Sequence, residues 1–261
     1  MISTSEHIDV QQDSGVLTLT MNRPQKKNAL TQDMYAALAD NIVVAQTDPA
    51  VRVILITGSG DSFSAGNDMG DFSRSNEGSV GGNALPPVGQ FLQAILKADK
   101  PIIAAVNGLA IGIGVTMLLH CDLVYASANA TFKTPFVDLG LVPEAGSSLL
   151  LPKLIGTQKA NDMFLLGTKI SADDAEKMGL VCTVFTAETL LDEAMIRAKA
   201  LASKAPNAVK LTKSLVRQDR DAVAQQMADE SVHFSAQLKT AEFAEAASAF
   251  AERRAPDFSN I

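Results

Sequence analysis

The chain has 261 residues, of which 47% are hydrophobic and 20% are charged. This composition is typical of an ordinary globular protein, and the length suits one large domain. The net charge of −7 argues against a nucleic-acid partner, because phosphate binding requires a basic face. Cys121 and Cys182 form neither a C-x-x-C motif nor a disulfide framework, so we expect a reducing, cytoplasmic location. The first residues carry neither a basic region nor an apolar run, which predicts no signal peptide.

Apolar periodicity predicts alternating strands and helices in the first 106 residues. We expect strands at 16–20, 51–57 and 102–106, and helices at 31–46 and 88–98. Thr31 is the predicted N-cap of the first helix, whose apolar face carries Met34, Ala37, Leu38, Ile42 and Ala45. Residues 73–87 are rich in Ser, Gly, Asn and Pro, which predicts a mobile loop that is cut first by proteases.

Residues 102–119 contain no charge and are just long enough to suggest a membrane span. Polar and glycine residues interrupt the segment, however, and Pro101 precedes its β-branched start. We therefore interpret it as a buried strand, a glycine-rich turn and a short buried helix of a protein that does not enter the membrane.

The second half continues the alternation and then becomes helical. We expect strands at 122–126 and 181–185, and helices at 147–155, 157–166 and from the Ser171 cap to Gly179. From residue 188 onward the pattern is helical, with breaks near Pro206, Arg220 and Gln237. The sequence thus predicts an α/β core over 1–200 and a helical carboxyl-terminal segment over 201–261.

Three segments bear residues suited to proton transfer beside a carbonyl group. Residues 143–148 (Pro-Glu-Ala-Gly-Ser-Ser) present one carboxylate, Glu144. Residues 63–69 and 107–114 are turns rich in small residues, which favours exposed backbone N–H groups. Such a carboxylate can take a proton while two N–H donors stabilise the oxyanion that develops.

Each candidate also has a simpler interpretation. A carboxylate such as Glu144 near a helix start complements the helix dipole, and Asn67 is an ordinary turn residue. The run from Gly108 to Gly114 has the spacing of a dinucleotide-binding fingerprint, but Met117 stands where the third glycine belongs. The presence of all three segments in one order favours the catalytic interpretation.

Together these segments resemble the crotonase (enoyl-CoA hydratase/isomerase) superfamily, and the resemblance runs from Arg23 to about Val184. Phe-Ser-Ala-Gly-Asn-Asp followed by Val-Pro-Glu-Ala-Gly-Ser-Ser is most similar to the Δ3,Δ2-enoyl-CoA isomerase branch. The resemblance implies a spiral of ββα turns. It also implies a homotrimer or a dimer of trimers, in which the helical segment takes part in trimerisation and covers the acyl-CoA site.

The resemblance further implies a role for individual residues. Glu144 would be the general base, and burial among Leu139, Leu141 and Val142 would raise its pKa. The backbone N–H groups of Asn67 and Ile113 would bind the thioester oxygen, a role that needs neither side chain. The implied substrate-binding residues are Lys26, on the phosphate side of coenzyme A, and Ala65, Gly66, Asn67, Asp68, Met69, Gly112 and Ile113.

The hydratases of this superfamily use two glutamates, whose positions here hold Thr116 and Phe136. Neither residue can act as acid or base, so the sequence predicts a 3-enoyl-CoA to 2-enoyl-CoA isomerase. We expect no metal or redox cofactor, because the oxyanion hole would supply the electrophile and the histidines lack ligand spacing. Coenzyme A would be part of the substrate. The alternatives are a weak hydratase or lyase of the same superfamily, and a non-catalytic acyl-CoA-binding protein.

Overall fold

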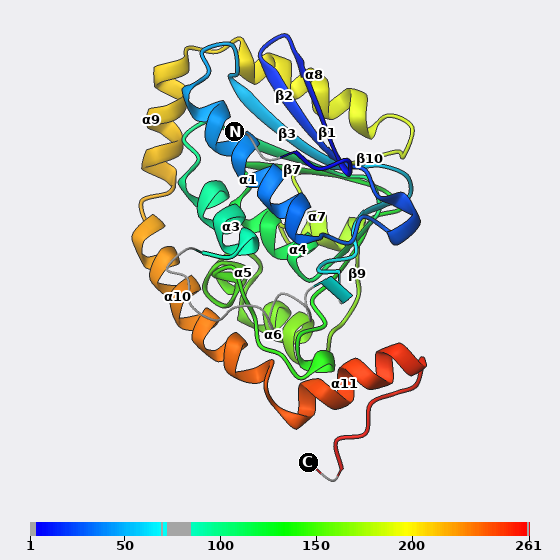
Figure 1. Ribbon diagram of the computed structural model, residues 1–261. Helices are drawn as coiled ribbons and strands as arrows, with labels where there is room; N and C mark the ends of the chain where they lie inside the picture. The colour runs from blue at the N-terminus through cyan, green and yellow to red at the C-terminus, as the bar shows by residue number, and fades with distance from the viewer. Residues whose placement is uncertain (1–3, 69, 72–84, 260) are drawn as a thin grey trace.

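The computed structural model describes residues 4–68, 70–71, 85–259 and 261 (Figure 1). Met69 and residues 73–84 of the predicted mobile loop lie outside the described residues. The expected mobility and protease sensitivity of that loop therefore stay predictions.

Two β-sheets form the centre of the protein. The larger has the order β1-β2-β3-β5-β7-β10, with β1 (Ile8–Asp13), β2 (Val16–Met21), β3 (Val53–Gly58), β5 (Ile102–Val106), β7 (Leu123–Ser127) and β10 (Thr183–Phe185). The smaller has the order β4-β6-β8-β9, with β4 (Ser62–Ser64), β6 (Leu109–Ile111), β8 (Thr131–Lys133) and β9 (Ile170–Ser171). All neighbours pair in parallel except β1 with β2 and β8 with β9.

The chain winds through both sheets as a repeated unit. Each turn adds one strand to the larger sheet and the next strand to the smaller one, as β3 then β4, β5 then β6, and β7 then β8. Successive turns stack in register, so that Ile54 lies opposite Ile102 and Ile103 lies opposite Leu123. This arrangement confirms the crotonase-like spiral of ββα units.

Helices cover the sheets on several sides (Figure 1). The helices of the core are α1 (Gln32–Thr47), α3 (Pro87–Lys97), α4 (Ile113–Thr116), α5 (Ser147–Ile155), α6 (Thr157–Leu165) and α7 (Ala172–Lys177). The described residues also include three short 3-10 helices, namely η1 (Pro24–Lys26), η2 (Met117–His120) and η3 (Val137–Leu139). α1 packs against α3, and the apolar face predicted for α1 is buried throughout.

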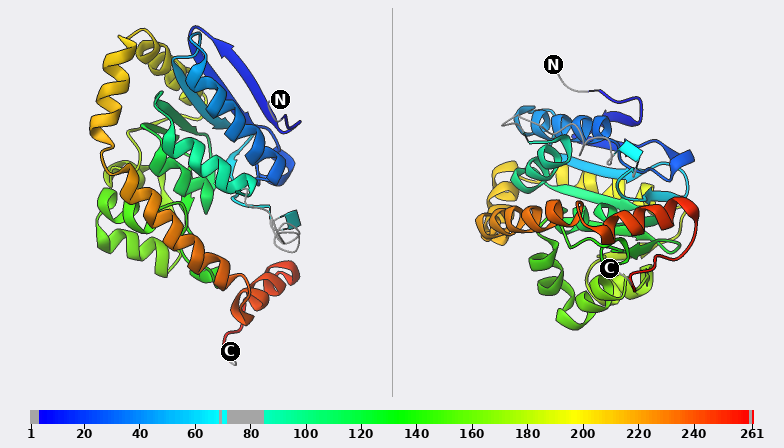
Figure 2. Two further views of the ribbon diagram at one scale, coloured as in Figure 1. Left: turned by 60° about the vertical axis from the view of Figure 1, so that its left-hand side comes forward. Right: turned by 60° about the horizontal axis from the view of Figure 1, so that its bottom comes forward.

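The carboxyl-terminal helices are α8 (Leu190–Ala202), α9 (Pro206–Val216), α10 (Arg220–Gln237) and α11 (Ala241–Glu252). Leu190, Ala194 and Ala198 of α8 are buried in one apolar cluster with residues of the larger sheet. α10 contacts α3 and α5, and α11 contacts η3. Figure 2 shows α10 lying along the body of the molecule, with α11 continuing from it toward the carboxyl terminus. That residues 201–261 form a separate helical segment and take part in a trimer stays a prediction.

The predicted strands and helices agree with the observed ones to within a few residues, except in the buried helix after Gly112. Five observed strands were not predicted, namely β1 and the four short strands of the smaller sheet. β1 was not expected, because all of its residues except Ile8 are exposed and no apolar alternation marks it. The buried helix after Gly112 is shorter than expected, since α4 has four residues and continues as η2. Residues 102–119 thus form β5, β6, α4 and most of η2, and no described helix is long and apolar enough to cross a membrane.

Candidate active site

Two backbone segments that the sequence analysis singled out lie side by side. Ala65–Asn67 follows β4, and Gly112–Ile113 follows β6, its parallel neighbour. A Cβ atom on Gly66, where φ is +89°, would come within 3.0 Å of the Ile111 carbonyl oxygen. The two turns therefore touch through their main chains, and a glycine at position 66 allows this approach.

The N–H groups assigned to the oxyanion hole differ from their neighbours in hydrogen bonding within the described part of the chain. The adjacent N–H groups of Asp68 and Gly112 donate to the carbonyl oxygens of Leu30 and Lys133, both at 2.9 Å. No acceptor among the described residues receives the N–H of Asn67 or of Ile113. Two donors on neighbouring segments are thus available to a bound oxygen atom.

A buried tyrosine holds the Asn67 turn. The Tyr35 hydroxyl, on α1, donates to Asn67 Oδ1 at 2.5 Å, and Tyr35 is fully buried. Burial and the nearby charge of Glu144 raise the pKa of Tyr35 well above its usual value, so the phenol stays protonated and remains a donor. The Asn67 side chain therefore has a structural partner, which the sequence analysis did not indicate.

Glu144 lies three residues before α5 rather than in its first turn. Thr116, on α4, donates its hydroxyl to Glu144 Oε1 at 2.5 Å. Burial, with a smaller contribution from the charge of Glu230, raises the pKa of Glu144 to about 7 against the opposing effect of the Thr116 hydrogen bond. A carboxylate with this pKa is a much stronger base than an exposed glutamate and is still partly ionised at neutral pH.

The turn that follows Glu144 has an unusual backbone. Ala145 and Gly146 have φ of 62° and 72°, a region that non-glycine residues rarely occupy. His120 Nε2 lies 2.7 Å from the Ala145 carbonyl oxygen. Burial lowers the pKa of His120 to about 4, so the ring is neutral near pH 7 and its Nε2–H donates to that carbonyl.

The far end of the same turn is held by Glu230, on α10. Its carboxylate accepts the N–H groups of Gly146 at 2.5 Å and Ser148 at 2.9 Å. Tyr35, His120 and Glu230 were all missed as members of the site. Tyr35 lies within an ordinary apolar helix pattern, and Glu230 lies in a helix that also carries Arg220, Asp221 and Asp229. No local signal marks either residue as part of the site.

Lys26 lies in η1 and is exposed. The carbonyl oxygen of its neighbour Lys27 accepts the N–H of Ala65 at 2.9 Å. Arg23, just before η1, forms an ion pair with Asp68 at 2.7 Å. These contacts bring the segment that carries Lys26 beside the Asn67 turn, with the Lys26 side chain in solvent.

The two hydratase positions are filled by residues that cannot transfer protons. Thr116 is buried and directed at Glu144, as described above. Phe136 is 5% exposed and its ring lies 6.2 Å from that of Phe164. Among these positions only Glu144 provides a carboxylate.

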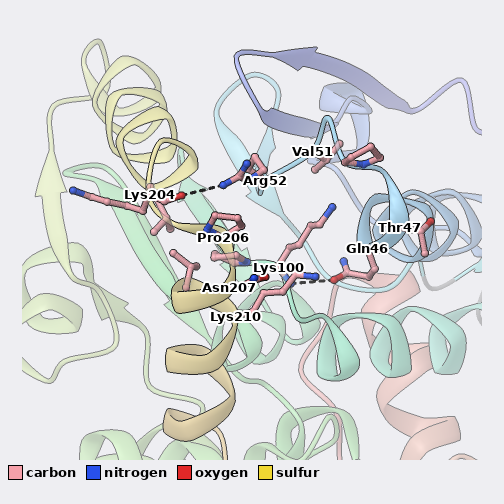
Figure 3. Close-up of a pocket in the computed structure, with 13 residues that line it drawn as sticks. Gln46, Thr47, Val51, Arg52, Lys100, Lys204, Pro206, Asn207 and Lys210 are labelled. Atoms are coloured by element: carbon pink, nitrogen blue, oxygen red, sulfur yellow. Dashed lines mark hydrogen bonds between the residues drawn. The ribbon is translucent and has the colours of Figure 1, made fainter.

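A cavity of about 300 Å³ lies elsewhere, where β3 and β5 begin, whereas the site just described follows the carboxyl ends of strands (Figure 3). Arg52, Lys100, Lys204 and Lys210 are among its lining residues. The Lys100 ammonium already donates to the carbonyl oxygens of Ala45 and Asp48, and Arg52 donates to that of Lys204. Two of the four cations thus stabilise the local backbone, and we assign the cavity no ligand.

Comparison with known proteins shows the family to which the chain belongs. The family model for enoyl-CoA hydratase/isomerase matches residues 11–260. Enoyl-CoA delta isomerase 2 of Rattus norvegicus is 40% identical over 217 residues, which are 82% of this chain and 55% of that protein. The 2,3-dehydroadipyl-CoA hydratase of Escherichia coli is 35% identical over 250 residues, or 95% of this chain and 97% of that protein. The chain thus spans about half the length of the delta isomerase.

A solved structure of an enoyl-CoA hydratase/isomerase from Pseudoalteromonas atlantica superposes with a TM-score of 0.92 at 47% identity. The match covers 97% of this chain and 100% of that one. Since family model, relatives and fold agree, the chain belongs to the enoyl-CoA hydratase/isomerase family.

Proposed function

We propose that this protein is a Δ3,Δ2-enoyl-CoA isomerase in which Glu144 is the only acid–base group. The observation that carries the proposal is the half-buried Glu144 carboxylate, held by Thr116 and with its pKa raised to about 7. Its ionised form is a strong base, and its protonated form is a competent acid near neutral pH. Both forms are needed in one catalytic cycle.

The reaction would begin when Glu144 removes a proton from C2 of the acyl chain. The thioester makes this proton acidic, and the N–H groups of Asn67 and Ile113 would stabilise the negative charge on the carbonyl oxygen. The electron pair then spreads over a dienolate from C2 to C4. Protonation of C4 by the same carboxyl group gives the conjugated 2-enoyl-CoA and returns Glu144 to its ionised form. This sequence of steps calls for no metal or redox cofactor.

The relatives support the proposal in part. The delta isomerase of Rattus norvegicus favours it, whereas the Escherichia coli relative, matched over nearly its whole length, is a hydratase. Hydration is therefore the second candidate. The filling of one hydratase position by Phe136 argues against it, because no second carboxyl group is available there to act on water.

One assay separates the candidates. Purified protein is mixed with 3-enoyl-CoA thioesters of several chain lengths, and the ultraviolet absorbance of the conjugated enoyl thioester is followed. An isomerase generates this absorbance. In a parallel reaction with 2-enoyl-CoA, a hydratase removes this absorbance. A non-catalytic acyl-CoA-binding protein leaves the absorbance unchanged with either substrate. Failure to convert any 3-enoyl-CoA would refute the proposal.

The proposed partners are acyl-CoA thioesters and further copies of this chain. A homotrimer or a dimer of trimers, with a cytoplasmic location, remains our prediction from the resemblance. Light scattering coupled to size-exclusion chromatography tests the assembly, since a monomeric mass at micromolar concentration would contradict it.

A further inference from the structure

Glu230 is a carboxylate whose burial calls for explanation. It is 5% exposed, and its partners lie at the start of α5. Oε2 accepts the N–H of Gly146 at 2.5 Å, and Oε1 accepts the N–H and the hydroxyl of Ser148 at 2.9 and 2.5 Å. Helix N-termini stabilise negative charge, and these three donors account for a buried anion without a cation.

The surrounding packing fixes this contact. A Cβ atom on Gly146 would lie 3.0 Å from Cγ1 of Val223 and 3.2 Å from Cγ of Met227. Val223 and Met227 are buried residues of α10, on the same helix as Glu230. α10 therefore meets the main chain at Gly146 directly, and the Glu230 hydrogen bonds fix the orientation of the turn at that contact.

The base is attached to this turn. Only Ala145 separates Glu144 from Gly146, so Thr116 holds the side chain of Glu144 while Glu230 holds the backbone just after it. Loss of the Glu230 hydrogen bonds leaves the turn free to shift. A shift of about 1 Å in a catalytic group costs on the order of 100-fold in rate.

We propose that Glu230 is a positioning residue, through which the docking of α10 keeps Glu144 against Thr116. The inference rests on the proposed function, because it takes Glu144 as the base. It implies that the base works efficiently only when the carboxyl-terminal helices are packed on the core.

The charge of Glu230 also acts on Glu144, since it adds to burial in raising the pKa of that residue. Asp229 and His233 line, with Glu230, a hollow of about 220 Å³ beside the turn. The titratable groups that face Glu144 or its turn are Tyr35 of α1, His120 of η2, and Asp229, Glu230 and His233 of α10.

The test uses Glu230→Gln, which keeps the shape and removes the charge and one acceptor. We expect kcat to fall about 10- to 100-fold with little change in KM, because the substrate contacts are intact. The titration midpoint of Glu144, followed by carbon NMR of labelled carboxyl groups without substrate, should also move down from about 7, although burial, the larger cause of its raised pKa, remains.

Asp229→Asn is the matched control. It removes the same charge one position away, from an exposed side chain that accepts a hydrogen bond from Gln225. It should leave kcat and the Glu144 midpoint at their wild-type values. An equal effect of both variants would mean that the net charge of α10 matters and not the Glu230 contact.

Two outcomes would overturn the proposal. One is Glu230→Gln with a lower melting temperature but unchanged kcat and Glu144 midpoint, because Glu230 would then only stabilise the fold. If Glu230→Gln does not fold, Glu230→Asp is used instead, because it keeps the charge but has a shorter side chain. The second outcome that would overturn the proposal is a Glu230→Asp variant whose kcat equals that of the wild type. If the wild type isomerises nothing, the proposed function fails, whereas the NMR titration still tests the link between Glu230 and Glu144.

Discussion

The two halves of the candidate site are held in place by different means. The oxyanion half is backbone against backbone, since Gly66 and Ile111 belong to consecutive turns of the spiral. The base half depends on side chains from distant elements, with Thr116, His120 and Glu230 each holding part of the turn around Glu144. The first half follows from the stacking of the fold itself, whereas the second requires several separate contacts to form together.

The largest expected effect comes from removing the base. Glu144→Gln keeps the size of the side chain and can still accept the Thr116 hydrogen bond, but it cannot take a proton. We expect the rate of isomerisation to fall about 100- to 10,000-fold, which is the usual contribution of a general base. Steady-state assays give the loss, and binding of an acyl-CoA product analogue should be retained. Activity within about tenfold of wild type would contradict the single-base mechanism.

The oxyanion half can be broken by one methyl group. Gly66→Ala places a Cβ atom 3.0 Å from the Ile111 carbonyl oxygen and forces a non-glycine residue into φ of +89°. We expect turnover to fall about 100- to 1,000-fold, as for loss of one oxyanion donor. Gly156→Ala is the control, because φ there is +82° but nothing lies within 4 Å of the added atom. Both variants should lose about 1–3 kcal/mol of stability, because each puts a Cβ atom into a backbone conformation that favours glycine, and only Gly66→Ala should lose activity.

The Tyr35–Asn67 hydrogen bond links the oxyanion half to α1, and its removal should have a moderate effect. Tyr35→Phe leaves the Asn67 amide oxygen without this donor, and Asn67→Ala leaves the buried phenol unpaired. We expect each to cost about 1–3 kcal/mol of stability and up to about tenfold in turnover. The double variant should cost less than the sum, because the two changes remove one shared contact. Fully additive losses in urea unfolding would mean that the contact contributes nothing.

The smallest effects concern stability and pH in the base half. The folded protein raises the pKa of Glu144 from 4.5 to about 7, so it binds this proton more tightly than the unfolded chain. Ionised Glu144 therefore costs stability as pH rises from 4.5 to 7. We expect the melting temperature of Glu144→Gln to exceed that of wild type by a margin that grows over this window. A constant margin from pH 5 to pH 8 would contradict a raised pKa of Glu144 in the folded protein.

His120 should behave in the opposite sense. Its pKa falls from 6.5 to about 4 on folding, so the unfolded chain binds more protons between these values. Stability is then lost as pH falls from 6.5 to 4. His120→Gln can still donate to the Ala145 carbonyl but does not titrate, so its stability should decline less over this window. The same series of melting temperatures measures the Glu144 and the His120 effects. An equal decline in stability of His120→Gln and wild type from pH 6.5 to pH 4 would contradict the His120 prediction.

Much of the fold and the oxyanion half could be predicted from the sequence, because short-range rules govern them. Apolar periodicity located β3, β5 and α1, and glycines marked the turns at Gly66 and Gly112, which both have positive φ. β1 escaped prediction because its exposed residues show no alternation. Glu144 was found by its place in a motif, and the direction of its pKa shift was expected from apolar neighbours.

Only the tertiary structure brought Tyr35, His120 and Glu230 to the site. Glu230 lies 84 residues from Gly146, and nothing in its own helix distinguishes it from the other acidic residues there. A hydrogen bond between side chains of distant elements forms only where those two elements pack together. Local sequence periodicity does not predict which elements pack together or in which orientation. The sequence by itself determined where the candidate base and the candidate oxyanion turns lie along the chain. The packing of α1, η2 and α10 decided how firmly that base and those turns are held.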